Sequence, residues 1–65
     1  MPTYVLNDDW AAQVRASGYG LDGSAMDTFV DQVRSELDGL VAQGINPTRN
    51  HLTTAITTVR IRRGM

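Results

Sequence analysis

The sequence of 65 residues contains no cysteine, no lysine and a single histidine. Without cysteine it forms no disulfide and offers no thiolate to a metal, and zinc sites normally need several His or Cys ligands. We therefore expect no metal and no cofactor. A chain this short buries only about 60 % of its unfolded surface. Its stability must then come from good packing or from self-association, and we expect a homodimer.

Long apolar runs are also missing. No stretch approaches the roughly 18 apolar residues that a membrane helix needs. Residues 1–6 have no basic side chain ahead of their apolar residues and are followed closely by Asp8 and Asp9, which is not the pattern of a signal peptide. These absences predict a soluble, cytoplasmic protein with no membrane partner.

All six basic residues are arginine. Arginine without lysine is consistent with planar recognition of phosphate or carboxylate groups. Alanine, glycine, valine and aspartate are prominent as well, and this composition favours a simpler explanation, a GC-rich genome or one of its phages or plasmids.

Acidic residues are missing from the last part of the chain. All seven lie between Asp8 and Asp38, where only two arginines oppose them, so residues 1–38 carry a formal charge of −5. Residues 39–65 hold four arginines and no acid, a formal +4. The total of −1 hides an acidic first part and a basic end, which favours docking onto a partner over chemistry.

The strongest helix signal covers residues 25–43. Ser24 and Asp27 have the spacing of an N-terminal capping box. Gly44 stands where a left-handed C-terminal cap belongs. Between them the apolar residues recur at helical spacing and form one stripe: Met26, Phe29, Val30, Val33, Leu37, Leu40 and Val41.

A second helix is expected at residues 47–60, with Asn46 as its N-cap and Pro47 in its first position. The connection from the long helix is short, so the two helices form a hairpin or a helix-turn-helix corner. Residues 59–62 remain open between helix and strand, because their apolar and polar residues alternate and β-branched residues precede them.

A third, shorter helix is expected at residues 8–17, capped by Asn7, with residues 3–6 extended. The extended segment either lies across the helices or pairs with residues 59–62. The chain is thus predicted to be a single all-α domain (residues 1–65), a small three-helix bundle of short, long and medium helices with a short extended N-terminal segment. The expected core comprises Met26, Phe29, Val33, Leu37, Leu40, Leu52, Ile56 and Val59, with Trp10 packed over it.

No residue pattern indicates catalysis, and we expect no catalytic residues. A histidine base needs a nucleophile or substrate proton within reach and usually an orienting acid, and His51 lies in the part of the chain that has no acid. Asp27 and Asp31 are too few for a calcium site. We interpret them as part of a solvated face on which Arg34 pairs with Asp31 and Asp38.

Two features of the last helix indicate a contact surface. Its outer face carries threonines and no charge, which suits close packing against a partner. Three arginines within four residues exceed what the negative end of the helix dipole requires, and we expect Arg60 and Arg62 to be exposed. The predicted partner-binding residues are Asn50, Thr54, Thr57, Arg60, Ile61, Arg62 and Arg63.

These patterns favour a small non-catalytic protein-binding module, an inhibitor or adaptor encoded by a phage or mobile element and acting on a host or cognate protein with an acidic surface. The alternative is a small helix-turn-helix-like DNA-binding regulator that uses residues 47–63 and their basic end. On an ideal helical wheel Arg60 and Arg62 lie on opposite flanks, which weakens the DNA hypothesis.

Overall fold

Three helices make up the fold in the computed structural model, which describes residues 4–65. They are α1 (Asp8–Ser17), α2 (Gly23–Ala42) and α3 (Arg49–Arg62), and residues 4–65 contain no strand. The predicted all-α fold with short, long and medium helices is therefore confirmed. The helix at residues 8–17 has the predicted bounds, and residues 59–62 are helical. No helix within residues 4–65 combines the length and the apolar character needed to cross a bilayer.

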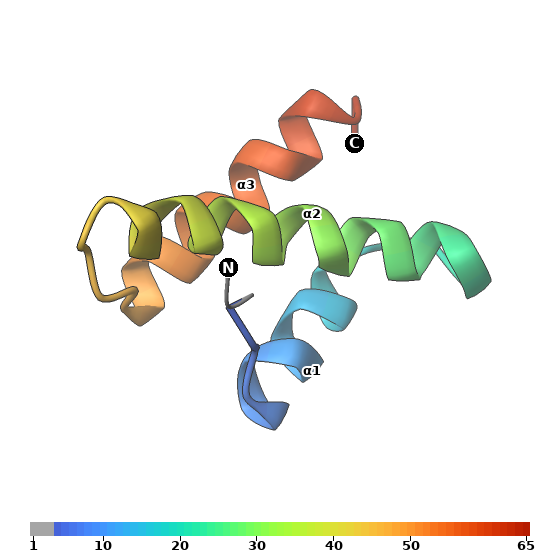
Figure 1. The fold of residues 1–65 in the computed structure, drawn as a ribbon. Helices are drawn as coiled ribbons and strands as arrows, with labels where there is room; N and C mark the ends of the chain where they lie inside the picture. The colour runs from blue at the N-terminus through green and yellow to red at the C-terminus, as the bar shows by residue number, and fades with distance from the viewer. Residues whose placement is uncertain (1–3) are drawn as a thin grey trace.

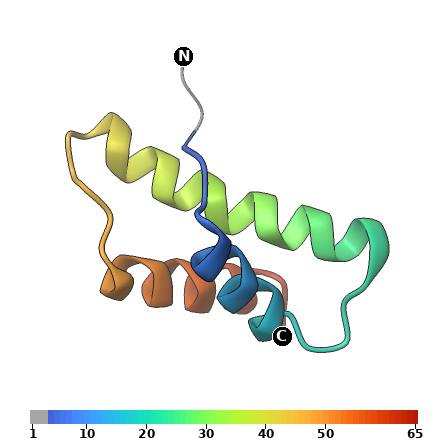
Figure 2. The ribbon, with the colours of Figure 1, turned by 90° about the horizontal axis from the view of Figure 1, so that it is seen from below.

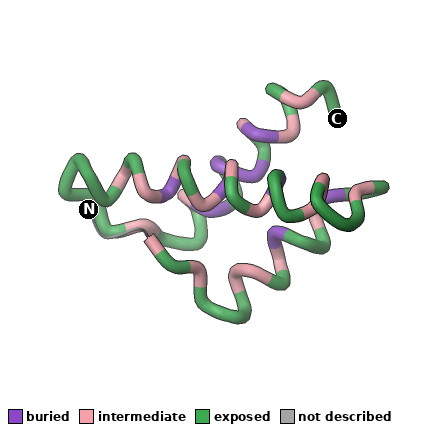
Figure 3. Tube along the Cα trace, turned by 45° about the vertical axis from the view of Figure 1, so that its right-hand side comes forward, coloured by how far each residue is buried: buried purple, intermediate pink, exposed green. Residues whose placement is uncertain are grey.

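The long helix α2 spans the molecule, and both α3 and α1 pack against it (Figures 1 and 2). Figure 3 shows the buried residues gathered where the three helices face one another. Phe29, Val33 and Leu37 of the α2 stripe are completely buried, so the shorter helices cover its middle. The full core comprises Val14, Phe29, Val33, Leu37, Leu52, Ala55, Ile56 and Val59.

The outer members of the predicted core are only half-buried. Met26 and Leu40 lie near the two ends of the α2 stripe, and Trp10 packs against the core from α1 as expected. Val41, the last residue of the stripe, is 45 % exposed. The apolar side of α2 is therefore most exposed at its C-terminal end.

Helix α2 begins two residues before the predicted start. Its N-cap is Asp22, and Gly23 makes the turn with a φ of +52°, which glycine adopts without strain. Ser24 thus stands inside the first turn, where its carbonyl accepts the hydroxyl of Thr28. The predicted Ser24–Asp27 capping box is wrong, because the helix has already begun at that point.

Helix α3 begins two residues after the predicted start, so the assignment of Asn46 as N-cap and Pro47 as first helical residue is wrong. The N-cap is Thr48, whose backbone N–H donates to His51 Nδ1 at 2.9 Å. A histidine thereby fills the place that Glu or Gln takes in a capping box.

Both α2 and α3 end in a left-handed glycine, as predicted for α2 at Gly44. Gly44 has a φ of +83°, and the N–H of Ile45 returns to the carbonyl of Leu40 at 2.9 Å. Gly64, with a φ of +76°, closes α3 in the same way. These bonds form the Schellman arrangement, which satisfies carbonyls that the end of a helix leaves free.

The N-terminal segment crosses the long helix. The N–H of Tyr4 donates to Asp38 Oδ1 at 3.0 Å, and Tyr4 and Leu6 pack against the core. Of the two arrangements left open by the sequence, lying across the helices is confirmed and pairing with residues 59–62 is wrong. Thr3, the first residue of the predicted extended segment, lies outside the described residues.

Asp38 is engaged by this crossing segment and not by Arg34. Within residues 4–65 the ion pair of Arg34 is with Asp31, at 3.1 Å, so the predicted pairing with Asp38 is wrong. The Asp31 side chain is 69 % exposed, so water screens the pair, which contributes about 0–1 kcal/mol.

Candidate functional site

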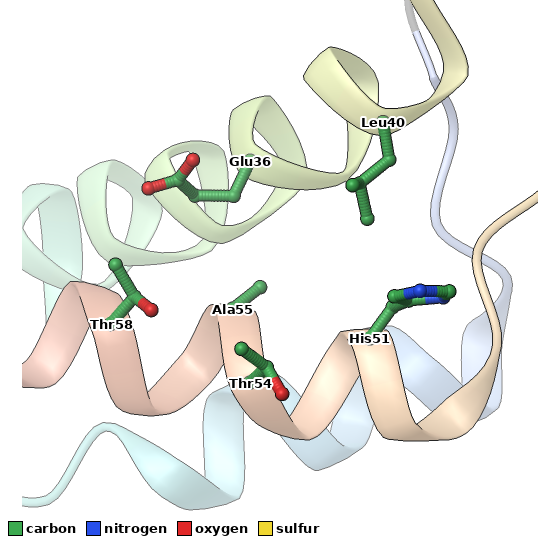
Figure 4. A pocket seen from close by; sticks show the side chains of 6 residues that line it. All are labelled: Glu36, Leu40, His51, Thr54, Ala55 and Thr58. Atoms are coloured by element: carbon green, nitrogen blue, oxygen red, sulfur yellow. The ribbon is translucent and has the colours of Figure 1, made fainter. Parts of the chain in front are cut away.

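A shallow groove of about 160 Å³ lies between α2 and α3 (Figure 4). Glu36 and Thr58 stand at one end, and Leu40 and His51 at the other. The spacing of one helical turn places Glu36 and Leu40 on the same side of α2, facing α3. The groove is lined by Glu36, Leu40, His51, Thr54, Ala55 and Thr58.

The lining and the size of the groove suit one apolar side chain. Leu40, Ala55 and the methyl groups of the two threonines supply apolar surface. An apolar cavity of about 150 Å³ takes up benzene, whereas pockets for drug-sized ligands measure about 300–1,000 Å³. The groove therefore has room for a group the size of a leucine or phenylalanine side chain and is too small for a typical cofactor.

The His51 ring is held at its end of the groove by the start of α3. Its Nδ1 accepts the Thr48 N–H at 2.9 Å and lies 3.2 Å from Thr48 Oγ1. Because Nδ1 accepts a proton donor, the neutral ring carries its own proton on Nε2. The capping contact thus fixes both the tautomer and the orientation of a groove-lining side chain.

An ion pair marks the opposite end. Arg62 Nη2 lies 2.9 Å from Glu36 Oε1, and the side chains are 62 % and 35 % exposed. This contact is the single hydrogen bond found for the Arg62 side chain within residues 4–65. Water therefore reaches both partners, and most of the guanidinium donors of Arg62 face solvent.

The outer face of α3 is exposed and uncharged, as the sequence predicts. Asn50, Thr54, Thr57 and Ile61, here called the threonine stripe, are all exposed, and Ile61 reaches 72 % exposure. Thr54 belongs to both the stripe and the groove, so the two surfaces are continuous.

Arg60 is half-buried, so its expected exposure is wrong. Its guanidinium lies over the Tyr19 ring, 5.3 Å from the ring centre. The expectation holds for Arg62, which is exposed. The two arginines contact different parts of the chain, since Tyr19 precedes α2 and Glu36 lies within it.

The third arginine of this group folds back onto α2. Arg63 Nη1 donates to Gln32 Oε1 at 2.8 Å, and its guanidinium lies 6.0 Å from the centre of the Phe29 ring. Among the three predicted arginines, Arg62 is thus the one whose contacts lie beside the groove.

Sequence reasoning missed the groove itself. The sequence places Leu40 in the core, and Glu36 carries no distinguishing signal. Helical periodicity shows which side of each helix faces the other, but not where small side chains leave a groove between them. The one available hint was the row of small side chains at Thr54, Ala55 and Thr58, which leaves room beside a facing helix.

From Tyr4 onward, no group of three or more His, Cys, Asp or Glu side chains converges. No protein family model, no curated protein and no solved structure matches this chain.

Proposed function

We propose that this chain is a small non-catalytic protein-binding module of the inhibitor or adaptor type. The partner packs on the threonine stripe and inserts one apolar side chain into the groove. The observation that carries this proposal is the continuity between a groove of single-side-chain size and an exposed, uncharged helix face.

The chemistry of the stripe supports a protein partner. Removing water from a threonine hydroxyl costs much less free energy than removing it from a charged side chain, and a hydrogen bond to the partner offsets that cost. Threonine is also stiff at its first side-chain torsion, so ordering it in a contact costs little entropy. A surface of this kind tolerates close packing along about three turns of helix.

Charge favours an acidic partner over a second copy of α3. Helix α3 and its cap carry Arg49, Arg60, Arg62 and Arg63 and no acid. Two copies that met through this face would bring arginines of the same sign together, which costs free energy. An acidic surface would instead be attracted to it, with a rate that falls as salt rises.

The arginine contacts support this reading over DNA binding. Arg60 stacks on Tyr19, and Arg63 is bonded to Gln32. Both residues are half-buried, so their guanidinium groups are less available to a phosphate than that of an exposed arginine. DNA binding usually rests on several simultaneous Lys or Arg contacts to the backbone.

The proposal is tested by comparing three forms of the protein as baits in cell lysate, each with and without nuclease. Thr54→Arg places a long charged side chain at the groove, and Thr28→Arg places the same charge at an exposed threonine of α2. We expect the wild type and Thr28→Arg to retain the same protein, and Thr54→Arg to lose it, regardless of nuclease.

Equal retention by all three baits would overturn the proposed site. Retention that disappears on nuclease treatment, together with salt-sensitive binding to duplex DNA, would overturn the proposed function in favour of the DNA-binding alternative.

A further inference from the structure

The ion pair between Arg62 and Glu36 lies at one end of the groove, and its geometry and exposure favour its replacement when a partner binds. We infer that the partner segment carries a carboxylate beside its apolar anchor, and that Arg62 exchanges Glu36 for this carboxylate on binding. This inference rests on the proposed function and specifies which protein segments the groove accepts.

The geometry of the pair is the first reason. Arg62 meets Glu36 through one nitrogen and one oxygen, 2.9 Å apart. A guanidinium has five donors in a planar fork and pairs best with a carboxylate through two parallel bonds. The observed contact makes one of the two bonds that the fork allows, so a carboxylate that pairs through both would replace it with a stronger contact.

Exposure is the second reason. Arg62 is 62 % exposed, and exposed ion pairs are weak because water and salt compete for both charges. A pair formed beneath a bound segment is shielded from that competition. Exchange therefore replaces a hydrated contact with a shielded one and leaves Glu36 free to turn toward water.

Position is the third reason. Glu36 lines the groove, and Arg62 lies one turn of α3 beyond Thr58, which also lines it. Arg60 and Arg63 are half-buried, held against Tyr19 and Gln32, whereas Arg62 is exposed. A carboxylate next to the anchored side chain therefore meets Arg62 first. A segment with a basic residue in that place would face Arg62 directly and be disfavoured.

The test uses a displayed library of twelve-residue peptides with a phenylalanine fixed at the centre and all other positions randomised. Selection on the wild-type protein is expected to enrich Asp or Glu within a few positions of the phenylalanine. A selected peptide is then synthesised with its acid intact or replaced by the corresponding amide, and its affinity is measured by calorimetry.

Two substitutions probe the exchange. Arg62→Gln is expected to weaken binding of the acidic peptide about two- to fivefold and to leave the amide peptide unaffected. Glu36→Gln removes the competing carboxylate and is expected to strengthen binding by a similar factor. Arg15→Gln and Asp27→Asn, at exposed sites on α1 and α2, make the same charge changes elsewhere and should not distinguish the two peptides.

The outcomes separate the two proposals. Selected peptides without an acidic preference, or an acidic peptide that binds Arg62→Gln as well as the wild type, would overturn the inference and leave the protein-binding function standing. A Glu36→Gln variant that binds more weakly than the wild type would show that Glu36 assists the partner and would overturn the exchange. No enrichment around the phenylalanine would overturn both.

Discussion

At the scale of single residues, the stability of the core depends on completely buried side chains such as Leu37. Leu37 is completely buried at the centre of the α2 stripe. Leu37→Ala should lower the free energy of unfolding by about 2–5 kcal/mol, because it removes apolar contacts and leaves a cavity. Small domains are stable by only about 5–15 kcal/mol, so thermal denaturation should reveal a large loss. Val5→Ala is the control, since Val5 is 80 % exposed, and a wild-type melting curve for Leu37→Ala would contradict this account.

His51 contributes at the start of α3 through one hydrogen bond. His51→Ala should lower the free energy of unfolding by on the order of 1 kcal/mol, because the Thr48 N–H then loses its acceptor. His51→Gln should retain most of the stability, since a glutamine at this position can accept the same bond. Chemical denaturation of the three proteins measures the difference. Equal losses in both variants would show that the ring contributes by packing and not by capping.

At the residue scale the sequence predicted burial better than polar contacts. The fully buried residues of α2 and α3 repeat at helical spacing, and this spacing alone identifies most of them. The capping role of His51 and the stacking of Arg60 on Tyr19 carry no such periodic signal. Both contacts depend on how two segments lie relative to each other. The side chains of His51 and Arg60 could each contact several other neighbours, so the sequence does not identify the partner.

At the scale of helices, the approach of α1 to α2 depends on a glycine. A Cβ added to Gly18 would lie 3.1 Å from Met26 Cε and 3.2 Å from Phe29 Cδ2. The thioether of Met26 can move aside, but the Phe29 ring is completely buried. Gly18→Ala should therefore destabilise the protein by about 1–3 kcal/mol, as overpacking usually does.

Gly39 provides the matched control for this substitution. It lies exposed within α2, and a Cβ there would meet no atom within 4 Å. Gly39→Ala should stabilise the protein by roughly 0.5–1 kcal/mol, because alanine has the better helix propensity. The two variants should thus change the free energy of unfolding in opposite directions. Destabilisation of equal size in both would contradict the close approach at Gly18.

Helix number, type and order were predictable from the sequence, and the starts of α2 and α3 were not. Periodicity is a property of many residues and survives a local error. A helix start depends on one or two polar side chains, and several candidates stood close together. Asp22 competes with Ser24 as the N-cap of α2, and Thr48 competes with Asn46 as the N-cap of α3. The left-handed cap at Gly44 was predictable because few other residues adopt its backbone conformation.

For the whole molecule, a homodimer stays a prediction. The apolar surface of α2 that is left for such a contact is smaller than the sequence suggested. The middle of the α2 stripe is buried within one chain, and the exposed apolar side chains near its end are Val41 and Ile45. If the chain dimerises, the C-terminal end of α2 and the loop that follows it are the expected contact. Light scattering across the micromolar range should then show the dimer mass for the wild type and the monomer mass for Val41→Glu. A monomer mass for both would contradict the prediction.

The small share that α1 takes in the core implies that the protein does not open all at once. Of the eight buried core residues, Val14 alone belongs to α1, whereas α2 and α3 supply the other seven. Partial opening reactions follow the segments with the fewest buried contacts. Trp10, the single tryptophan, lies in α1, so its fluorescence reports on this helix while circular dichroism reports mainly on the other two. Release of α1 should appear as a fluorescence change at lower denaturant than the loss of helix, and coincident transitions would show that the three helices unfold as one unit.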